Sequence, residues 1–345
     1  MSRVVDLAVV GGGPVGLATA VAGAIAGLSV VVLEARAGDG DKACGEGLMP
    51  SALAALQGWG VDPQGHDVFG ITYRHGQRCA SARFRGGPGR GVRRTTLVAA
   101  LRERADTLGV ATRLERVPSL EQSSQQVTVG SVTARYVAVA DGLHSPLRRA
   151  LGLYRRPARR AGSVARYGQR RHYAVRPWSP MVEVTWADDA EAYVTPVGPR
   201  EVGVAVLGRR GGSFDDWLTR FPELTERLAA APVTSRVRGA GALRQTASSR
   251  VAGRALLVGD AAGYVDALTG EGMAVGFASA QALVDCVVRD QPEAYERRWR
   301  QVTRRPRLLT EGLLAATASQ RLRRGLVPAA QRVPFAFDTA VNLLA

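Results

Sequence analysis

Three glycine-rich segments carry the residues whose types and spacing indicate chemistry. The first reads GGGPVG over residues 11–16 and lies between two apolar runs, 4–10 and 30–33. Glycines at such a turn let a pyrophosphate approach the backbone, and the following helix offers free N–H groups and partial positive charge. Glu34 ends the second run, where a carboxylate can accept both hydroxyls of an adenosine ribose. The segment predicts a dinucleotide site formed by Gly11, Gly13, Pro14, Val15, Gly16, Glu34, Ala35 and Arg36.

The other two segments decide which dinucleotide is expected. After a turn over 251–254, an apolar strand over 255–258 runs into Gly259-Asp260, and a helix opens from about Gly270. An aspartate there can bind a polyol hydroxyl, and the helix start can face a phosphate or a flavin carbonyl. FAD is long enough to need both ends held in this way. A strand entering the third segment, 136–148, leads to Asp141. The expected contacts are Asp141, Gly259, Asp260, Gly270, Glu271, Gly272 and Met273.

A membrane span is the competing interpretation of the first segment. Nothing between Leu7 and Leu33 is charged, and the stretch exceeds the roughly 20 residues that a bilayer requires. Three consecutive glycines, Pro14 and a further break at Gly27 argue against one unbroken helix. The strand begins almost at Met1, with no basic region and signal-type cleavage site before it. We therefore expect a cytoplasmic protein and no membrane association.

Composition narrows the functional class. The 345 residues can bury a real core, and the formal net charge is +16. Lys42 is the single lysine among 46 basic residues, which indicates a coding bias toward arginine rather than a nucleic-acid-binding surface. Such a surface can still attract an anionic partner, NADPH or an acidic carrier protein. Three cysteines and four histidines fit neither a disulfide framework nor a metal site.

Together the three segments resemble the fingerprints of the FAD-dependent aromatic hydroxylase superfamily, the group A flavin monooxygenases, in order and spacing. The resemblance implies that Asp260 holds the flavin ribityl chain and that residues 141–148 lie near the flavin and are linked to pyridine-nucleotide use. Arg94, which opens the sequence RTTLVAAL, resembles the family's arginine near the flavin, although Arg93 is an equally basic neighbour.

Two local features are similar to the geranylgeranyl-reductase-like branch, which also contains monooxygenases of natural-product pathways. These are CGEGLMP over 44–50 and LTGEG over 268–272. Most aromatic hydroxylases carry Pro where Ala267 stands and Gln where Glu271 stands, and the Trp-x-Trp-x-Ile-Pro segment of flavin halogenases is missing. Cys44 and Glu46 are the candidate catalytic residues, in a loop expected over the isoalloxazine. The alternative is a glycine-hinged loop with an inert cysteine and a solvated carboxylate.

The resemblance and the strand pattern predict an α/β fold. Its Rossmann-like FAD-binding domain is of the glutathione-reductase type, similar to p-hydroxybenzoate hydroxylase (PHBH-like). Strands at 71–74, 166–175, 181–186, 192–197 and 202–207 predict an inserted antiparallel sheet over the reactive end of the flavin. The expected domains are a discontinuous FAD-binding domain (1–69, 91–155, 243–291), a substrate domain (70–90, 156–242) and a C-terminal helical segment (292–345). The apolar tail over 333–345 is expected to pack on the body, with a partner or membrane as alternatives.

The resemblance implies an FAD-dependent monooxygenase that hydroxylates or epoxidises a hydrophobic natural-product intermediate through a flavin C4a-hydroperoxide. NADPH or NADH would be a transient reductant, since no second Rossmann unit is visible, and the substrate could be tethered to a carrier protein. Candidate pocket residues, which could equally be core, are Phe84, Trp178, Trp186 and Tyr193, and the histidines are poor candidates for a base. The alternatives are a flavin reductase of C=C bonds and a redox-silent, FAD-scaffolded cyclase or binding protein. The oligomeric state stays open.

Overall fold

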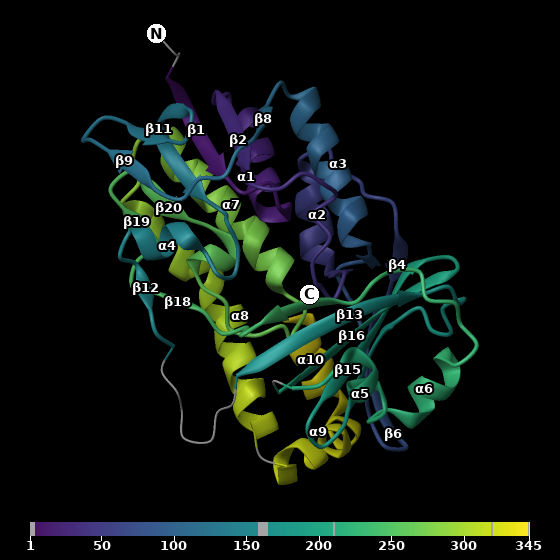
Figure 1. Ribbon diagram of the computed structural model, residues 1–345. Coiled ribbons are helices and arrows are strands. Elements are labelled where there is room, and N and C mark those ends of the chain that lie inside the picture. Colours follow the sequence, from purple (N-terminus) through teal and green to yellow (C-terminus); the bar gives the residue numbers. More distant parts are fainter. Residues whose placement is uncertain (1–3, 158–164, 210, 319, 344) are drawn as a thin grey trace.

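The computed structural model describes residues 4–157, 165–209, 211–318, 320–343 and 345. Segment 158–164, within the predicted unit 156–242, and residues 1–3 of the predicted unit 1–69 lie outside the described residues. Figure 1 shows a parallel sheet with helices on one side, a second sheet across its end, and C-terminal helices below both. This is the expected α/β architecture with an inserted sheet.

The first sheet has the strand order β19-β20-β11-β1-β2-β8. Strands β20, β11, β1, β2 and β8 run parallel, and β10 and β9 extend β11 as an antiparallel meander. The strands are β1 (Val5–Val10), β2 (Val30–Glu34), β8 (Ala111–Leu114), β9 (Leu120–Gln122), β10 (Val127–Val129), β11 (Val132–Val139), β19 (Val251–Ala252) and β20 (Ala255–Leu257). β1, β2 and β11 are apolar and largely buried, as expected of strands covered on both faces.

Helices α1, α3 and α7 cover this sheet, and α1 contacts both of the others. The helices of this unit are α1 (Pro14–Ile25), α2 (Pro50–Gly58), α3 (Arg94–Thr107), α4 (Pro146–Ala150) and α7 (Gly272–Val288), with the 3₁₀ helix η1 (Gly259–Ala262). Helix α1 begins with a proline, whose missing N–H costs nothing in the first turn. It ends at Ile25, and Gly27, which follows the C-cap residue, has the left-handed φ of +82° that closes a helix. The short sheets β3-β7-β4 (Gly47–Leu48, Gly89–Gly91, His66–Val68) and β12-β18 (Tyr154–Arg155, Thr246–Ala247) complete it.

The inserted sheet has the order β17-β13-β16-β15-β14-β5-β6. Its strands are β5 (Gly70–His75), β6 (Arg78–Arg83), β13 (Arg166–Tyr173), β14 (Val182–Trp186), β15 (Glu191–Gly198), β16 (Glu201–Arg209) and β17 (Arg238–Gly241). One pair departs from the antiparallel expectation, because β5 and β14 run parallel. They come from segments far apart in the chain, so no tight hairpin forces them to alternate direction.

The two faces of the inserted sheet pack against different partners. One face packs on α5 (Phe214–Leu218) and α6 (Pro222–Leu228) in a cluster around Val204 and Trp217. The other forms a cluster around Tyr73 and Trp186 with residues of the C-terminal helices. Those helices are α8 (Ala294–Ala318), α9 (Gln320–Arg332) and α10 (Pro334–Asn342). Val341 and Phe337 of the tail lie in this cluster, so the tail packs on the body.

Candidate functional site

The turn after β1 brings the first and third glycine-rich segments together. Gly11 has a φ of +112°, and a Cβ there would lie 2.4 Å from the carbonyl oxygen of Ala140, just before Asp141. A Cβ at Gly16 would lie 1.8 Å from the carbonyl oxygen of Gly11. No side chain fits at either position, so the first residues of α1 lie in close backbone contact with the turn. The N-cap residue of α1 is Gly13, and no side chain caps the N–H groups of the first helical turn.

Val15, in the first turn of α1, connects the second segment to this turn. A Cβ at Gly259 would lie 3.0 Å from Val15 Cγ1, and a Cβ at Gly276 would lie 2.5 Å from Val15 Cγ2. The glycines of η1 and α7 therefore let both elements approach α1 closely. All three glycine-rich segments meet at the carboxyl end of the parallel sheet, where ligands bind in open α/β folds.

Glu34 holds a fixed position at the end of β2. Its Oε2 accepts a hydrogen bond from the Gly12 N–H at 2.6 Å, and its Oε1 accepts one from the Arg36 N–H at 3.0 Å. Ala35 and Arg36 follow on the exposed surface. A carboxylate oxygen accepts more than one hydrogen bond, so Glu34 keeps capacity for a ribose hydroxyl.

A cluster of cations faces the same turn. Arg94 donates from Nε to the carbonyl oxygen of Gly40 at 2.9 Å, and its Nη2 lies 3.6 Å from the Cβ position of Gly13. Arg93 pairs with Glu201 at 3.3 Å instead, so of the two arginines Arg94 is the one that faces this turn. Burial, with the nearby charges of Arg94 and Arg36, lowers the pKa of Lys42. Sequence reasoning missed Lys42, although a single lysine in so arginine-rich a chain was a signal.

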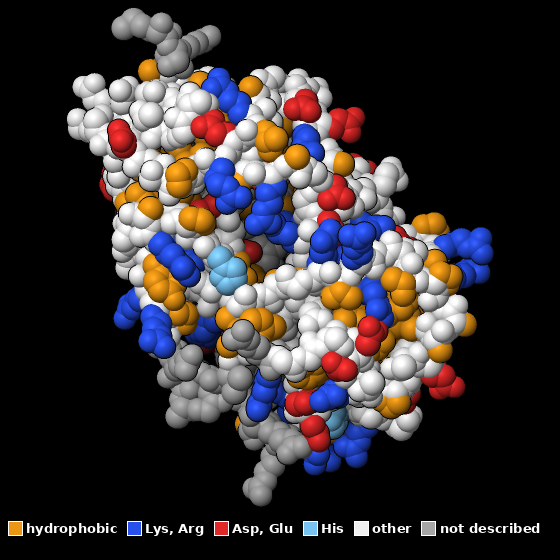
Figure 2. All heavy atoms as spheres, viewed as in Figure 1, with side chains coloured by type: hydrophobic (Ala, Val, Ile, Leu, Met, Phe, Trp, Pro, Cys, Tyr) orange, Lys and Arg blue, Asp and Glu red, His pale blue; other side chains and the backbone are white. Residues whose placement is uncertain are grey.

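Basic side chains also surround the opening of the site. Figure 2 shows them gathered around a hollow near the middle of this face. Positive potential around a concave site raises the rate at which anionic ligands arrive. The positive charge of these side chains would attract the pyrophosphate of a bound dinucleotide and a phosphorylated reductant that binds transiently.

Asp260 lies in η1 beside these cations. Burial raises the pKa of its carboxyl group, and the charges of Arg94, Lys42 and Arg148 partly offset that effect. Its carboxylate makes no hydrogen bond to any other described residue, so it is available to a ligand. Arg148, which is 0% exposed, donates to the carbonyl oxygens of Ala261 at 2.9 Å and Leu143 at 2.9 Å. Arg148 thereby ties the third segment to η1.

Asp141 caps the short helix α4. Its Oδ2 accepts a hydrogen bond from the Leu147 N–H at 3.1 Å, and burial raises the pKa of the carboxyl group. Its Oδ1 is buried and finds no partner in the described part of the chain. A buried unpaired oxygen is unfavourable, so this atom fits a site completed by a polar ligand.

The start of α7 differs slightly from expectation. Gly270 has a φ of +71°, which no helical residue adopts, so the helix begins two residues later, at Gly272. Glu271 is its N-cap and is buried, and Met273 is half-buried behind the parallel sheet. The free N–H groups of this helix start face the same end of the sheet as those of α1.

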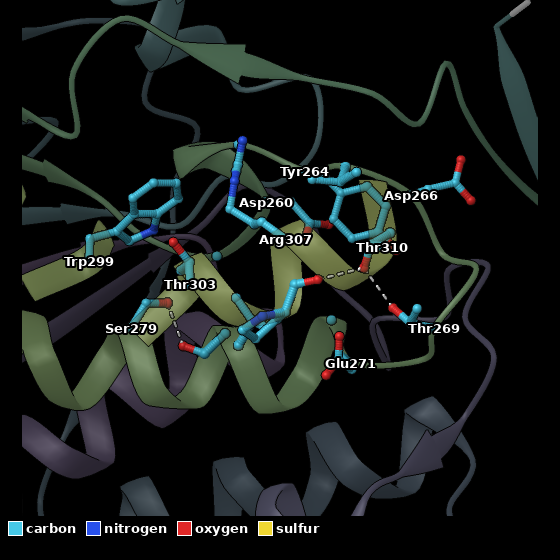
Figure 3. Close-up of a pocket in the computed structure, with 17 residues that line it drawn as sticks. Asp260, Tyr264, Asp266, Thr269, Glu271, Ser279, Trp299, Thr303, Arg307 and Thr310 are labelled. Carbon is cyan, nitrogen blue, oxygen red and sulfur yellow. Dashed lines mark hydrogen bonds between the residues drawn. The ribbon is translucent and has the colours of Figure 1, made fainter. Parts of the chain in front are cut away.

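A small cavity of about 50 Å³ lies between η1, the start of α7 and α8. Figure 3 shows Thr310 linking Thr269 to α8, with hydrogen bonds of 3.0 Å to the Thr269 hydroxyl and 2.9 Å to the Pro306 carbonyl. Thr303 also lines it, with a buried hydroxyl unpartnered among the described residues. The volume suits a few water molecules, and Asp260 and Glu271, two of the expected FAD contacts, also line the cavity.

Glu271→Gln is expected to stabilise the FAD-free protein increasingly as the pH rises. Burial raises the pKa of Glu271 from 4.5 to about 8. Between these values the folded state holds a proton that the unfolded state has released, so the wild-type protein loses stability as pH increases. The variant should gain about 1–3 kcal/mol on the wild type between pH 5 and 8, and no more above pH 8. Urea unfolding across this range measures the difference.

Glu226→Gln, on an exposed turn of α6, is the matched control for that measurement. Its stability difference from the wild type should stay flat with pH. A flat difference for Glu271→Gln as well would contradict the raised pKa.

The loop carrying Cys44 and Glu46 lies between the FAD-binding unit and the inserted sheet. Cys44 Sγ accepts a hydrogen bond from the Glu46 N–H at 3.4 Å, and burial raises the pKa of the thiol. The carboxylate of Glu46 is turned away from solvent, with Oε2 lying 2.5 Å from Nε2 of His172. Sequence reasoning set the histidines aside, and His172 carried no local signal. His144 is exposed and contacts the Gly241 carbonyl oxygen at 2.8 Å.

The face of the inserted sheet that packs on the C-terminal helices, and in part on the FAD-binding unit, is lined by aromatic side chains. Tyr73 and Trp186 have ring centroids 5.2 Å apart, and Phe84 packs on the same cluster. Tyr193 donates its hydroxyl to the carbonyl oxygen of Leu268 at 3.0 Å, directly before the start of α7. Trp178 packs on the opposite face with α5 and α6 and cannot line the same pocket.

A comparison with protein families matches residues 4–288 to the FAD-binding domain family. The chain belongs to this family. FAD is therefore its cofactor, its activity is that of an FAD-dependent oxidoreductase, and NAD(P)H is the reductant typical of the family.

Two further comparisons agree with this family. A menaquinone reductase of Mycobacterium tuberculosis H37Rv is 30% identical over 306 residues, covering 79% of this chain and 73% of the relative. The flavin-dependent brominase Bmp2 matches 99% of this chain and 93% of its own with a TM-score of 0.84 and 16% identity. The p-nitrophenol 4-monooxygenase PnpA of Pseudomonas putida DLL-E4 covers 99% of both chains, with a TM-score of 0.78 and 20% identity. The structural matches show the fold. Within the described residues, no helix is long and apolar enough to cross a membrane.

Proposed function

We propose that this FAD-dependent oxidoreductase is a monooxygenase that uses NADPH or NADH to hydroxylate or epoxidise a hydrophobic natural-product intermediate. The observation that carries the proposal is the aromatic cluster of the inserted sheet, placed directly against the segment before α7. Trp186 is 5% exposed, and its buried indole N–H has no partner among the described residues, which suits a substrate oxygen.

The residues of the three segments fit FAD. The N-terminus of α1, with Arg94 and Lys42, would hold the pyrophosphate, and Glu34 would hold the adenosine ribose. Asp260 would bind the ribityl chain, while the N–H groups at Gly272 would face the flavin ring. FAD supplies the redox chemistry when bound, so the protein needs to orient the substrate and exclude water. The basic opening would attract NADPH or an acidic carrier protein that presents the substrate.

Reduction of a C=C bond is the second candidate, because the menaquinone reductase similarity extends over most of the chain. Cys44 is the one cysteine of the chain in the loop beside the cation cluster, and its raised pKa keeps the thiol protonated. A protonated thiol near the flavin could donate the proton that saturation of an alkene requires.

An assay with NADPH, with and without oxygen, separates the two candidates. The probes are a long-chain alkylphenol and menaquinone, and the product mass is measured. A monooxygenase should consume oxygen and add one oxygen atom to a probe, and Cys44→Ser should leave flavin reduction by NADPH intact. An anaerobic gain of two hydrogens by menaquinone that persists after air has reoxidised any quinol, and that is abolished in Cys44→Ser, would replace the first candidate by the second. If neither probe changes in mass with or without oxygen, and no NADPH is oxidised, a redox-silent role would be favoured.

A further inference from the structure

We propose that Glu46 and His172 form a positioning pair through which the inserted sheet holds the Cys44–Gly47 loop closed beside the FAD site. Neither side chain is part of the proposed cofactor cradle. The inference rests on the proposed function only for its catalytic consequence, because the position of the loop can be measured without turnover.

Glu46 has an unfavourable backbone conformation, whose free-energy cost its hydrogen bonds must offset. Its φ is +59°, the left-handed region that costs a non-glycine residue roughly 1–2 kcal/mol. The residue is only 5% exposed, and its carbonyl oxygen accepts a hydrogen bond from the Val92 N–H at 2.8 Å. Its carboxylate Oε1 accepts another from the Arg94 N–H at 2.9 Å, at the start of α3. The side chain therefore holds the loop in a conformation that the backbone alone disfavours.

His172, in β13, supplies the partner for the other carboxylate oxygen. It is 0% exposed, and its Nε2 lies 2.5 Å from Glu46 Oε2. On the far side of the ring, Nδ1 lies 2.8 Å from the hydroxyl of Ser235 and 3.3 Å from Nη1 of Arg170. A guanidinium can only donate, so we assign Nδ1 as the acceptor and Nε2–H as the donor to Glu46.

The charges around the pair balance without a proton on Nδ1. Arg170 is buried and faces two carboxylates, pairing with Asp41 and lying 3.7 Å from Glu46 Oε1. Arg238 pairs with the second oxygen of Asp41 at 2.8 Å. Two guanidinium groups thus face two carboxylates, and a neutral imidazole completes the arrangement.

The loop is also fastened to the sheet at two points that precede Glu46. Arg170 donates to the carbonyl oxygen of Lys42 at 3.0 Å, and the Thr195 hydroxyl donates to that of Gly45 at 2.8 Å. A Cβ at Gly203 would lie 2.8 Å from Glu46 Oε2, so the sheet accommodates the carboxylate because residue 203 has no side chain. Lys42 is itself one of these attachment points, and Cys44 lies between the two. Their positions consequently depend on the sheet.

Removing the donor from His172 would leave a buried carboxylate without its partner. A carboxylate in that position gains free energy by reaching water, and it can do so only if the loop opens. Cys44 is half-buried in the closed loop, so loop opening would expose it further and move Lys42 away from the cation cluster. The thiol is therefore a reporter of loop position that requires neither substrate nor turnover.

The test is alkylation of Cys44 by iodoacetamide in a Cys79→Ser background, because Cys79 is exposed and Cys286 is buried. Peptide mass spectrometry gives the rate at Cys44 in protein loaded with FAD and in protein freed of it. In both forms His172→Leu should be labelled about 10–100-fold faster than the background protein. His172→Gln, whose amide N–H can reach the carboxylate, should restore a rate near the original. His75→Leu, on β5, is the matched control and should have no effect.

Glu46→Gln gives a second route to the same conclusion if His172→Leu does not fold. Its amide can still accept from the Arg94 N–H, but then turns an N–H toward His172 and should also accelerate labelling. Labelling at the background rate in every folded variant would overturn the proposal. A failure to transfer oxygen, with labelling accelerated as expected, would overturn the proposed function and leave the positioning pair in place.

Discussion

Gly16→Ala is expected to lose FAD with the protein still folded. The new Cβ would lie 1.8 Å from the Gly11 carbonyl oxygen, far inside van der Waals contact. The third glycine of this motif is replaceable by alanine in some dinucleotide-binding folds, but here it faces backbone and not a side chain that could move. Relief requires the turn and the start of α1 to separate, which shifts the N–H groups that bind the pyrophosphate.

The expected loss of affinity is about 100-fold or more, corresponding to roughly 3 kcal/mol of overpacking strain. Flavin fluorescence titration of the FAD-free protein measures it, and circular dichroism checks that the fold persists. Gly58→Ala, at the end of α2 where a Cβ would meet nothing within 4 Å, is the control and should bind FAD normally. Unchanged affinity in Gly16→Ala would remove the pyrophosphate from this turn.

The FAD-binding unit could be predicted because its signals are local. The order of apolar strand, glycine turn and small-residue helix follows from hydrophobic periodicity and from the conformational demands at Gly11 and Gly27. Local signals also located the junction at Gly259-Asp260 and the helix after it, with a shift of two residues because Gly270 adopts a left-handed φ. The resemblance to a known superfamily then supplied the order in which these segments meet.

The inner contacts of the site could not be predicted because they join residues distant in sequence. Glu46 and His172 are 126 residues apart, and nothing in either segment marks the other as its partner. The same holds for the parallel pairing of β5 with β14, which depends on how the two insertions dock. Burial decides such contacts, because a buried carboxylate must find donors somewhere in the fold. The identity of the donor becomes visible only when the sheet is assembled.

Asp260→Ala is expected to weaken FAD binding by about 10–150-fold, the effect of losing one charge-assisted hydrogen bond of roughly 1.5–3 kcal/mol. In the FAD-free protein its carboxylate makes no hydrogen bond to another described residue, and burial raises its pKa. The ionised group is therefore not stabilised by the fold itself. The variant should consequently have an unfolding free energy no lower than that of the wild type while losing affinity for the cofactor.

Asp266→Ala is the informative comparison because it removes a carboxylate of similar burial, six residues away, from a different set of contacts. Asp266 pairs with Arg166 at 3.1 Å and accepts from the Leu268 N–H at 3.2 Å, so both bonds belong to the inserted sheet and the loop before α7. Its removal should change FAD affinity by no more than about threefold, because no hydrogen bond to the cofactor is lost. Equilibrium dialysis with FAD gives both affinities. Equal affinities in the two variants would mean that the ribityl chain does not lie beside η1, since only Asp260 stands among the cations that face the turn after β1.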